Sequence, residues 1–230
     1  MLHPRIIPCL LVHNQGLVKT TKFQDPKYVG DPINAVKILN EKEVDELVVL
    51  DIDASVLGHE PNYKMIENLA AECRMPFCYG GGIKNEEQAL RIFGLGVEKI
   101  AVSSLAIENP FIVEKIAQKV GNQSMVVVID AKKKLLSNKY EAYIHNGKVN
   151  SKLDVEKLVA DLEKMGVGEI VINSIDKDGT MSGYDLNSIK KIRDTISIPL
   201  TVFGGAGNYD DLGNLIAENG IIGAGAGSLF

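Results

Sequence analysis

The sequence predicts a (β/α)8 barrel, the TIM-barrel fold, made of two half-barrel repeats. Short runs of β-branched and apolar residues alternate with amphipathic segments along the 230 residues, which is the pattern of parallel βαβ units. The chain also repeats itself, since several segments recur 123 or 124 residues later. A repeat of that length is half a domain rather than one unit of a solenoid. The matching segments are Glu46–Asp53 with Glu169–Asp176, Gly80-Gly81-Gly82 with Gly204-Gly205-Ala206-Gly207, and Ser104-Leu105 with Ser228-Leu229.

The alternation resolves into eight expected strands and seven expected helices. The strands are Ile6–Leu10, Glu46–Asp51, Phe77–Tyr79, Lys99–Val102, Val126–Asp130, Glu169–Asn173, Leu200–Phe203 and Gly220–Ala224. The helices are Ile33–Asn40, Tyr63–Cys73, Glu86–Leu95, Phe111–Val120, Val155–Met165, Leu186–Thr195 and Asp210–Ala217. The first helix has a clear start, because Asp31 can cap its free N–H groups and Pro32 suits its first turn. Gly96, Gly166 and Gly220 each follow a helical segment, where a left-handed residue often ends the helix.

A doubly wound sheet fits the same alternation, but a two-fold repeat of four units favours a barrel that closes from two equal halves. We therefore expect one domain over residues 1–230, with half-barrels at about residues 1–121 and 122–230. The eighth helix is missing from this scheme, because only Gly225–Phe230 follow the last expected strand. A missing or disordered tail is the favoured explanation.

Two loops between an expected strand and the next helix are longer than the others. His13–Gly30 is polar around a central Gly-Leu-Val-Lys, and it could act as a lid. Ala131–Lys152 contains alternating residues before Asn146-Gly147, which is the strongest short-range signal for a β-hairpin.

Composition excludes several classes of function. The net charge of −5 and the isoelectric point near 5.5 give no support to nucleic-acid binding. No apolar stretch approaches the roughly 20 residues that span a bilayer, and the first residues do not resemble a signal peptide. Three cysteines without metal-ligand spacing indicate reduced thiols in a cytoplasmic protein. His3, His13, His59 and His145 do not cluster by spacing, so we expect no metal and no cofactor.

The ends of the strands carry residues suited to binding phosphate. Active sites of such barrels lie at the carboxyl ends of the strands, and backbone N–H groups there can hold an anion. The two halves each place a glycine cluster and a serine turn at these ends, so a ligand with phosphate at both ends is expected, although the glycines could also serve only tight turns. The candidates are Gly81, Gly82, Ser103, Ser104, Gly204, Gly205, Gly227 and Ser228.

One position breaks the symmetry between the halves. The fifth expected strand ends in Asp130, whereas its counterpart, the first strand, ends in Leu11. A carboxylate at Asp130 can act as a general acid or base if burial shifts its pKa, and the alternative is a structural Asp that caps its loop. Weaker candidates for the same mouth are Lys19 in the expected lid, Asp51, Asp176, Asp178 and Thr180. The three aspartates are equally expected to anchor loops, and Lys19 is equally expected to be a solvated lysine.

A second set of charged residues lies at the opposite end of the strands. Arg5, Glu46, Lys99 and Glu169 stand at or near the starts of four expected strands. Two acids and two bases that point into the barrel bottom could pair as a ring. Ordinary surface ion pairs are the competing interpretation.

These residues closely resemble the HisF family, the cyclase subunit of imidazole glycerol phosphate synthase, over the whole chain. The most specific stretches are Arg5–Leu10, Gly80–Ile83, Val128–Lys132, Ser174–Thr180 and Gly204–Gly207. The resemblance implies a barrel that receives ammonia from a HisH-like glutaminase partner docked on its bottom face. It also implies that Arg5, Glu46, Lys99 and Glu169 form a charged ammonia gate, and that the substrate carries phosphate at both ends.

The chain departs from the family at the top of the barrel. The family's cyclase chemistry uses two aspartates, and Asp130 matches one of them, while Leu11 occupies the position of the other. Leucine cannot transfer a proton. Ser103 replaces an Asn of the family, and Phe203 replaces a small polar residue. This combination resembles the cyclase-like subunits of surface-polysaccharide pathways, which work with a glutaminase to amidate an acetamido sugar.

Three hypotheses follow for the function. The first is an ammonia-using barrel subunit of a glutamine amidotransferase that serves amidination of a surface sugar. The second is a histidine-pathway cyclase in which another group replaces the missing acid. The third is a non-catalytic ammonia conduit that activates its glutaminase.

Overall fold

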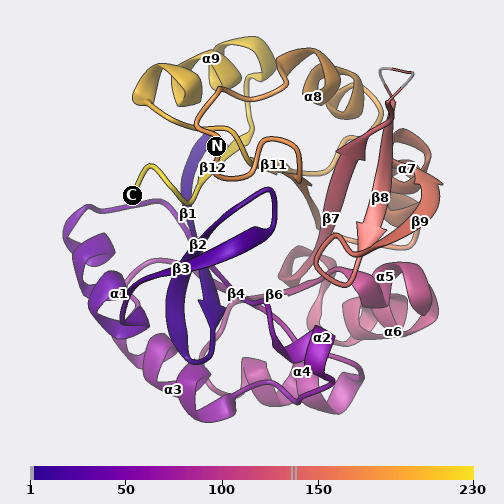
Figure 1. The fold of residues 1–230 in the computed structure, drawn as a ribbon. Helices are drawn as coiled ribbons and strands as arrows, with labels where there is room; N and C mark the ends of the chain where they lie inside the picture. Colours follow the sequence, from indigo (N-terminus) through magenta and orange to yellow (C-terminus); the bar gives the residue numbers. More distant parts are fainter. Residues whose placement is uncertain (1–2, 136, 138) are drawn as a thin grey trace.

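The computed structural model describes residues 3–135, 137 and 139–230 and forms the expected (β/α)8 barrel (Figure 1). Eight parallel strands pair in the closed order β1-β4-β5-β6-β7-β10-β11-β12, and β12 pairs back to β1. These strands are β1 (Arg5–His13), β4 (Leu47–Asp51), β5 (Phe77–Gly80), β6 (Lys99–Val102), β7 (Met125–Lys133), β10 (Glu169–Ser174), β11 (Leu200–Phe203) and β12 (Gly223–Ala226).

Helices surround the barrel, and most begin at a side chain that satisfies a free N–H group. The longer helices are α1 (Pro32–Glu41), α3 (Tyr63–Glu72), α4 (Glu86–Phe93), α6 (Pro110–Val120), α7 (Val155–Lys164), α8 (Leu186–Arg193) and α9 (Tyr209–Asn219). The expected cap at Asp31 is confirmed, because its carboxylate accepts from the N–H of Asn34 at 2.9 Å and Pro32 fills the first turn. Asn62, Asn85, Asp154, Asp185 and Asn208 cap five other helices in the same way.

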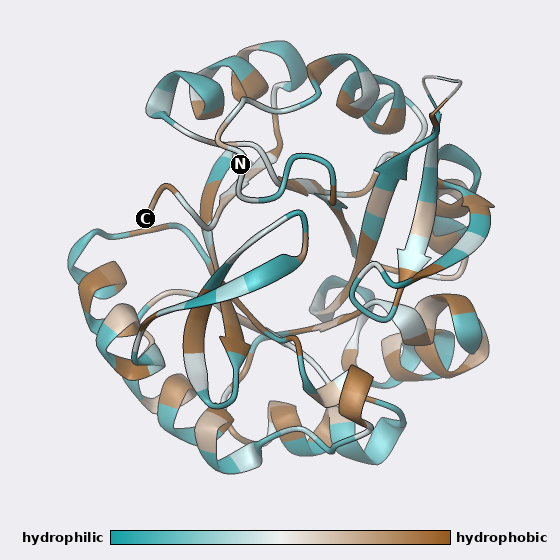
Figure 2. Cartoon of the chain, in the orientation of Figure 1, coloured by the Kyte–Doolittle hydropathy of each residue, from teal (hydrophilic) through white to brown (hydrophobic). Residues whose placement is uncertain are grey.

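The apolar residues divide into two layers. The larger layer lies between the barrel and the helices, and it contains the fully buried Phe77, Tyr79 and Leu162. Figure 2 shows the helices of the outer ring carrying both hydrophobic and hydrophilic residues, as helices that bury only one side do. The smaller layer fills the inside of the barrel and is called the interior column below. Its members are Ile7, Val48, Cys78, Ala101, Val126, Val128, Val171 and Phe203, with Cys9 and Leu50 packed against them.

The two long loops contain β-hairpins. The expected hairpin in 131–152 is confirmed as β8 (Tyr140–Ile144) and β9 (Val149–Asp154). The prediction of an irregular loop over 13–30 is wrong in part, because this segment forms the strands β2 (Gly16–Thr21) and β3 (Gln24–Gly30). Leu17 and Val18 of β2 are buried, which gives this hairpin the apolar contacts that a polar loop would lack. In Figure 1 the indigo hairpin lies across the mouth of the barrel.

Other differences from the expected elements are local. β1 continues three residues past Leu10, because Leu11–His13 pair with β2, and Leu11 and Val12 also pair with β4. The last strand lies at Gly223–Ala226 rather than Gly220–Ala224, because α9 runs to Asn219 and Gly220 turns the chain with φ 68°. Two short helices, α2 (Ala54–Leu57) and α5 (Ser104–Glu108), and a 3₁₀ turn at Asn122–Ser124 were not expected. In the part of the chain that the structure describes, no helix follows β12 and none has the length and apolarity needed to cross a membrane.

Candidate functional site

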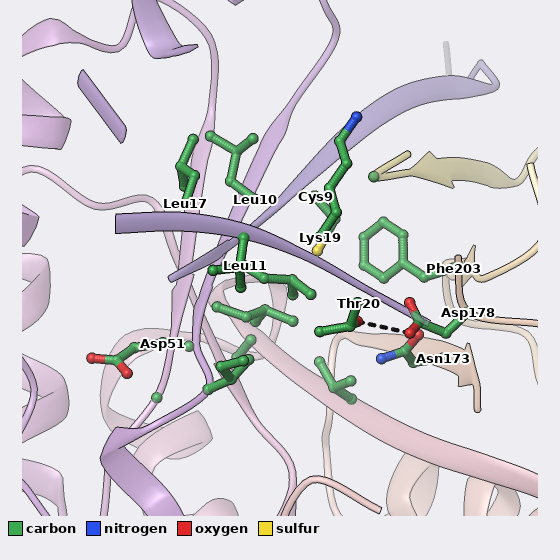
Figure 3. Close-up of a pocket in the computed structure, with 18 of the residues that line it drawn as sticks. Cys9, Leu10, Leu11, Leu17, Lys19, Thr20, Asp51, Asn173, Asp178 and Phe203 are labelled. Atoms are coloured by element: carbon green, nitrogen blue, oxygen red, sulfur yellow. Dashed lines mark hydrogen bonds between the residues drawn. The ribbon is translucent and has the colours of Figure 1, made fainter. Parts of the chain in front are cut away.

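A cavity of about 560 Å³ opens at the carboxyl end of the barrel, which is the end that the sequence predicts for the site (Figure 3). All eight barrel strands contribute to its wall, and β2 adds residues from above. The cavity is therefore assembled by the closure of the barrel rather than by any one loop.

Nearly every residue that the sequence singled out for the mouth lies on this wall. The wall contains Asp130, Lys19, Asp51, Asp178, Gly81, Gly82, Ser103, Ser104, Gly204, Gly205, Gly227 and Ser228. Thr180 does not line the cavity, and its hydroxyl donates instead to the backbone carbonyl of Lys177 at 2.9 Å. Four of the glycines have positive φ, namely Gly81, Gly82, Gly204 and Gly205.

Asp130 is the buried acid of the cavity. Its side chain leaves the inner face of β7 and only 7% of the residue is exposed. Burial raises the pKa of its carboxyl to about 7, while a hydrogen bond from Asn173 at 3.3 Å opposes the shift and the charge of Asp178 adds to it. A carboxyl with this pKa can both accept and donate a proton near neutral pH.

Leu11 lines the same cavity from β1. Figure 3 shows Leu10, Leu11, Leu17 and Asp51 toward one side of the pocket, while Asn173 and Asp178 lie on the other side. A leucine here can contact a ligand only through its methyl groups. The residue at position 11 therefore cannot donate a proton to a ligand or accept one from it.

Asp178 fastens the β2–β3 hairpin over the cavity. Its Oδ2 accepts from the Thr20 hydroxyl at 2.7 Å and from the Phe23 N–H at 2.9 Å, and its carbonyl accepts from the Lys22 N–H at 3.0 Å. Burial raises the pKa of Asp178, although the two hydrogen bonds to its carboxylate oppose that rise. The carboxylate thus holds both sides of the hairpin tip.

We expect Asp178→Ala to loosen this hairpin without unfolding the barrel. Two hydrogen bonds to a charged group are lost, and such bonds contribute about 1–3 kcal/mol each. Limited digestion with trypsin should cleave after Lys19, Lys22 or Lys27 about tenfold faster than in the unchanged protein. Asp176→Ala is the matched control, because Asp176 accepts from the Lys133 N–H and does not touch the hairpin. Equal cleavage of the two variants would contradict the role given to Asp178.

The turn of the β8–β9 hairpin reaches the first of the two expected phosphate sites. The His145 N–H donates to the Ser104 hydroxyl at 3.0 Å, and the Asn146 amide donates to the Ile52 carbonyl. His145, Asn146 and Gly147 all have positive φ, which bends the turn toward the barrel. Any ligand that uses the Ser104 hydroxyl shares it with this turn.

Lys19 lies at the second expected phosphate site. Its ammonium group donates to the Ser228 carbonyl at 3.1 Å and to the Phe230 carbonyl at 2.8 Å. A positive charge is thereby placed beside Gly227 and Ser228, where an anionic ligand group would be stabilised.

Asp51 has a structural role at the edge of the cavity. Its Oδ1 accepts from the N–H groups of Asp53 at 3.0 Å and Ala54 at 3.1 Å. Burial raises the pKa of Asp51, and these two hydrogen bonds partly reverse the effect. The group thus anchors the start of α2, which the sequence left as an equally good alternative to a role in the site.

Three residues of the site were missed by the sequence reasoning. Asn173 hydrogen-bonds the catalytic candidate Asp130, Thr20 bonds Asp178, and Asn146 lines the cavity from a distant hairpin. Asn173 had a detectable signal, because it is polar, ends a strand and matches Leu50 in the other half of the repeat. The other two depend on how hairpins fold over the barrel, which the sequence did not indicate.

At the opposite end of the barrel, the four charged residues form a closed ring, called the ion ring below. Arg5 contacts Glu46 at 2.5 Å and Glu169 at 2.7 Å, and Lys99 contacts each of the same acids at 2.8 Å. Thr201 adds a hydrogen bond to Glu169 at 2.7 Å. The two acids are buried, while Arg5 and Lys99 are about one-fifth exposed. The ring is therefore a built feature and not a set of ordinary surface ion pairs.

The charges of the ion ring support one another. Burial alone would raise the pKa of Glu169, but the Arg5 hydrogen bond and the Lys99 charge outweigh it and hold that pKa below its usual value. Among residues 3–135, 137 and 139–230, no group of His, Cys, Asp or Glu is arranged to hold a metal ion.

Comparison with known proteins places the chain among barrels of one family. The family described as "Histidine biosynthesis protein" matches residues 5–230. A protein of Leptospira borgpetersenii is 60% identical over 230 residues, which are 100% of this chain and 91% of the relative. Its name assigns it provisionally as imidazole glycerol phosphate synthase subunit HisF.

Two other relatives carry related names. A Vibrio vulnificus (strain YJ016) protein, assigned provisionally as imidazole glycerol phosphate synthase subunit hisF3, is 54% identical over 100% of this chain and 88% of its own length. A Lactococcus lactis subsp. lactis (strain IL1403) protein named imidazole glycerol phosphate synthase subunit HisF is 40% identical over 92% of this chain and 82% of its own length.

Proposed function

Since the chain belongs to the HisF family of histidine biosynthesis proteins, we propose that it is the ammonia-using barrel subunit of a glutamine amidotransferase. Its partner is a HisH-like glutaminase that docks on the bottom face, next to the ion ring. The reaction at the top of the barrel is amidination of an acetamido sugar for surface polysaccharide rather than cyclisation in histidine synthesis.

One observation carries this proposal: the two ends of the barrel differ in how well they fit the family's chemistry. The ion ring is complete, with each acid held by both bases. The cavity at the top holds Asp130 but has Leu11 where a second acid would stand. We therefore infer that this chain keeps the family's means of receiving ammonia and differs from the family in the reaction that uses it.

The cavity supports a phosphorylated ligand of moderate size. Lys19 lies at the Gly227–Ser228 end, and the Ser103–Ser104 turn lies on the same wall. The methyl groups of Leu11 offer an apolar contact for a methyl group, as an acetamido substituent has. A sugar that bears a phosphate or diphosphate offers both features.

Asp130 supplies the proton transfer that ammonia needs. When ammonia forms a bond to the electrophilic carbon of the sugar substituent, its nitrogen becomes positively charged and must lose a proton. The Asp130 carboxylate accepts that proton, because its pKa of about 7 matches a base that works near neutral pH. The acetamido oxygen is first activated by ATP in a separate step, so that it carries a phosphate or adenylate group and leaves with it when the C–N bond forms.

The deciding experiment is an assay of the complex with its own glutaminase. Glutamine is supplied together with either the histidine-pathway cyclase substrate or the activated acetamido sugar. We expect amidinated sugar to form and cyclisation to remain far below the rate of HisF enzymes. Cyclisation at ordinary HisF rates, or growth of a cyclase-deficient histidine auxotroph that carries this gene, would overturn the proposal.

Restoring the acid should not restore cyclisation. In Leu11→Asp we expect the histidine-pathway rate to stay at least about a hundredfold below that of HisF enzymes, because Ser103 and Phe203 also reshape the wall. The rate of the purified variant with ammonium salt measures this. Leu11→Asn controls for polarity without an acid. Full recovery in Leu11→Asp would show that one residue accounts for the whole difference.

A histidine-pathway cyclase is the second candidate, and one observation favours it. Asp178 is a half-buried acid on the same cavity wall, and burial raises its pKa. It could stand in for the acid that Leu11 replaces. The auxotroph test distinguishes this candidate from the sugar amidotransferase.

A further inference from the structure

Phe203 occupies the boundary between the interior column and the cavity. It packs with the interior column and also lines the cavity, as Cys9, Leu50, Ala101 and Val128 do, and it has the largest side chain of the five. Although it faces a cavity of about 560 Å³, only 4% of the residue is exposed. Most of the ring is therefore surrounded by barrel atoms rather than by the open pocket.

The position of Phe203 along β11 places it directly above the ion ring. Side chains two residues apart on a strand point to the same side. Thr201 points into the barrel and donates to Glu169 of the ion ring, so Phe203 also points inward, about 6.6 Å further toward the cavity. Ammonia that passed the ion ring would meet this aromatic ring before it reached the pocket.

The neighbouring strand leaves room for the ring. A Cβ atom on Gly225 of β12 would lie 1.9 Å from Cδ1 of Phe203, a distance that no side chain can adopt. Gly223, two residues earlier, leaves room for Thr201 in the same way, because a Cβ atom on Gly223 would lie 2.0 Å from the Thr201 hydroxyl oxygen. Glycine at 225 thus lets the Phe203 ring pack directly against the backbone of β12 inside the barrel.

We propose that Phe203 is an apolar exit gate that closes the interior column from the cavity. This inference rests on the proposed function, because a gate matters only if ammonia travels through the barrel. A closed apolar column keeps bulk water out, and ammonia without water remains uncharged and mobile. Opening the gate would join the column to the solvent of the cavity.

The gate can be tested without any substrate or partner. Cys78 lies in the interior column, paired in register with Lys99 of the ion ring, and is 1% exposed. Burial raises the pKa of the Cys78 thiol, and methyl methanethiosulfonate reacts with the thiolate, so this reaction reports whether water and the reagent together enter the column. Trypsin separates the three cysteines into Ile6–Lys19, Met65–Arg74 and Met75–Lys84, so mass spectrometry reads each one individually.

We expect Phe203→Ala to speed the labelling of Cys78 about tenfold or more while the labelling of Cys73 stays unchanged. Cys73 lies at the end of α3, outside the barrel, and reports any general loosening. Val202→Ala is the matched control, because Val202 is the neighbouring residue of β11 and points to the helices. Phe203→Leu keeps an apolar plug and should label more slowly than the alanine variant, and it also serves if alanine prevents folding.

Two results would overturn the inference. Labelling of Cys78 within twofold of the unchanged protein would mean that Phe203 does not block the column. A parallel rise for Cys73, or an equal rise in Val202→Ala, would mean that Phe203 only fills space. In the complex with glutaminase, Phe203→Ala should also lower the product formed per glutamine hydrolysed. A complex that makes no product in its unchanged form would contradict the proposed function and leave the labelling result standing.

Discussion

Asp130→Asn is expected to lower product formation by the glutaminase complex at least about a hundredfold, because general acid–base catalysis contributes factors of that order. Asparagine keeps the shape of the side chain and can still bond Asn173, but it cannot take the proton from ammonia. Glutamine hydrolysis by the partner should continue, since the ion ring is untouched. The measurement is product and glutamate formed by the same sample.

The pH dependence gives the same substitution a second readout. The folded-state pKa of Asp130 is about 7, above the ordinary value of about 3.9. A raised acid pKa means that the folded protein binds the proton more tightly, so the ionised group destabilises the fold as pH rises from about 4 to about 7. At pH 8 we therefore expect Asp130→Asn to be more stable to urea by about 2–4 kcal/mol, and near pH 4 to show no gain.

Asp176→Asn is the control for both readouts. Asp176 follows β10 and accepts a backbone hydrogen bond from Lys133, but it does not line the cavity. It should change neither product formation nor the pH dependence of stability. If Asp130→Asn retained full product formation, the barrel would be a conduit without catalysis of its own.

Much of the fold could be predicted because its signals are local and periodic. Buried strands such as Lys99–Val102 and Leu200–Phe203 were placed to the residue by apolar runs and flanking glycines. The repeat then gave the two-fold arrangement of strands, and the barrel rule placed Asp130 and the glycines on one mouth. The shared position of the four charged residues at strand starts allowed a ring but did not separate it from ordinary surface ion pairs.

The remainder depends on contacts between segments far apart in sequence. β2 and β3 were taken for a loop because their polar residues hide the buried pair Leu17 and Val18. The bounds of β12 were predicted three residues too early at its start and two too early at its end, because glycine and alanine have little β-propensity and do not mark the ends of a strand. Thr180 matched a family stretch, yet its own turn uses its hydroxyl and keeps it off the cavity wall. The crossing of Phe203 over Gly225 became apparent only with both strands in place.

The ion ring should be the most sensitive point of the barrel to the loss of one charge. In Glu169→Gln, Arg5 and Lys99 lose the carboxylate that both contact and must share Glu46 alone. Removing one partner of a buried ion pair costs about 3–5 kcal/mol, and for a chain of this size about 3 kcal/mol lowers the melting temperature by roughly 10 °C. Calorimetry at pH 7 measures this. Glu141→Gln is the control, because Glu141 pairs with Lys134 at the surface and its replacement should change the melting temperature little.

The sign of the pH effect separates this result from a simple packing loss. The pKa of Glu169 is held below its usual value, so its charge stabilises the fold at neutral pH, and this stabilisation disappears as pH falls through the lowered pKa. The difference in free energy of unfolding between the unchanged protein and Glu169→Gln should therefore stay constant from pH 7 to about 4.3 and become smaller at lower pH. A difference that persisted at lower pH would come from shape rather than charge. With the glutaminase bound, the variant should also lose more product with glutamine than with added ammonium, because in the proposed function only the glutamine route crosses the ion ring.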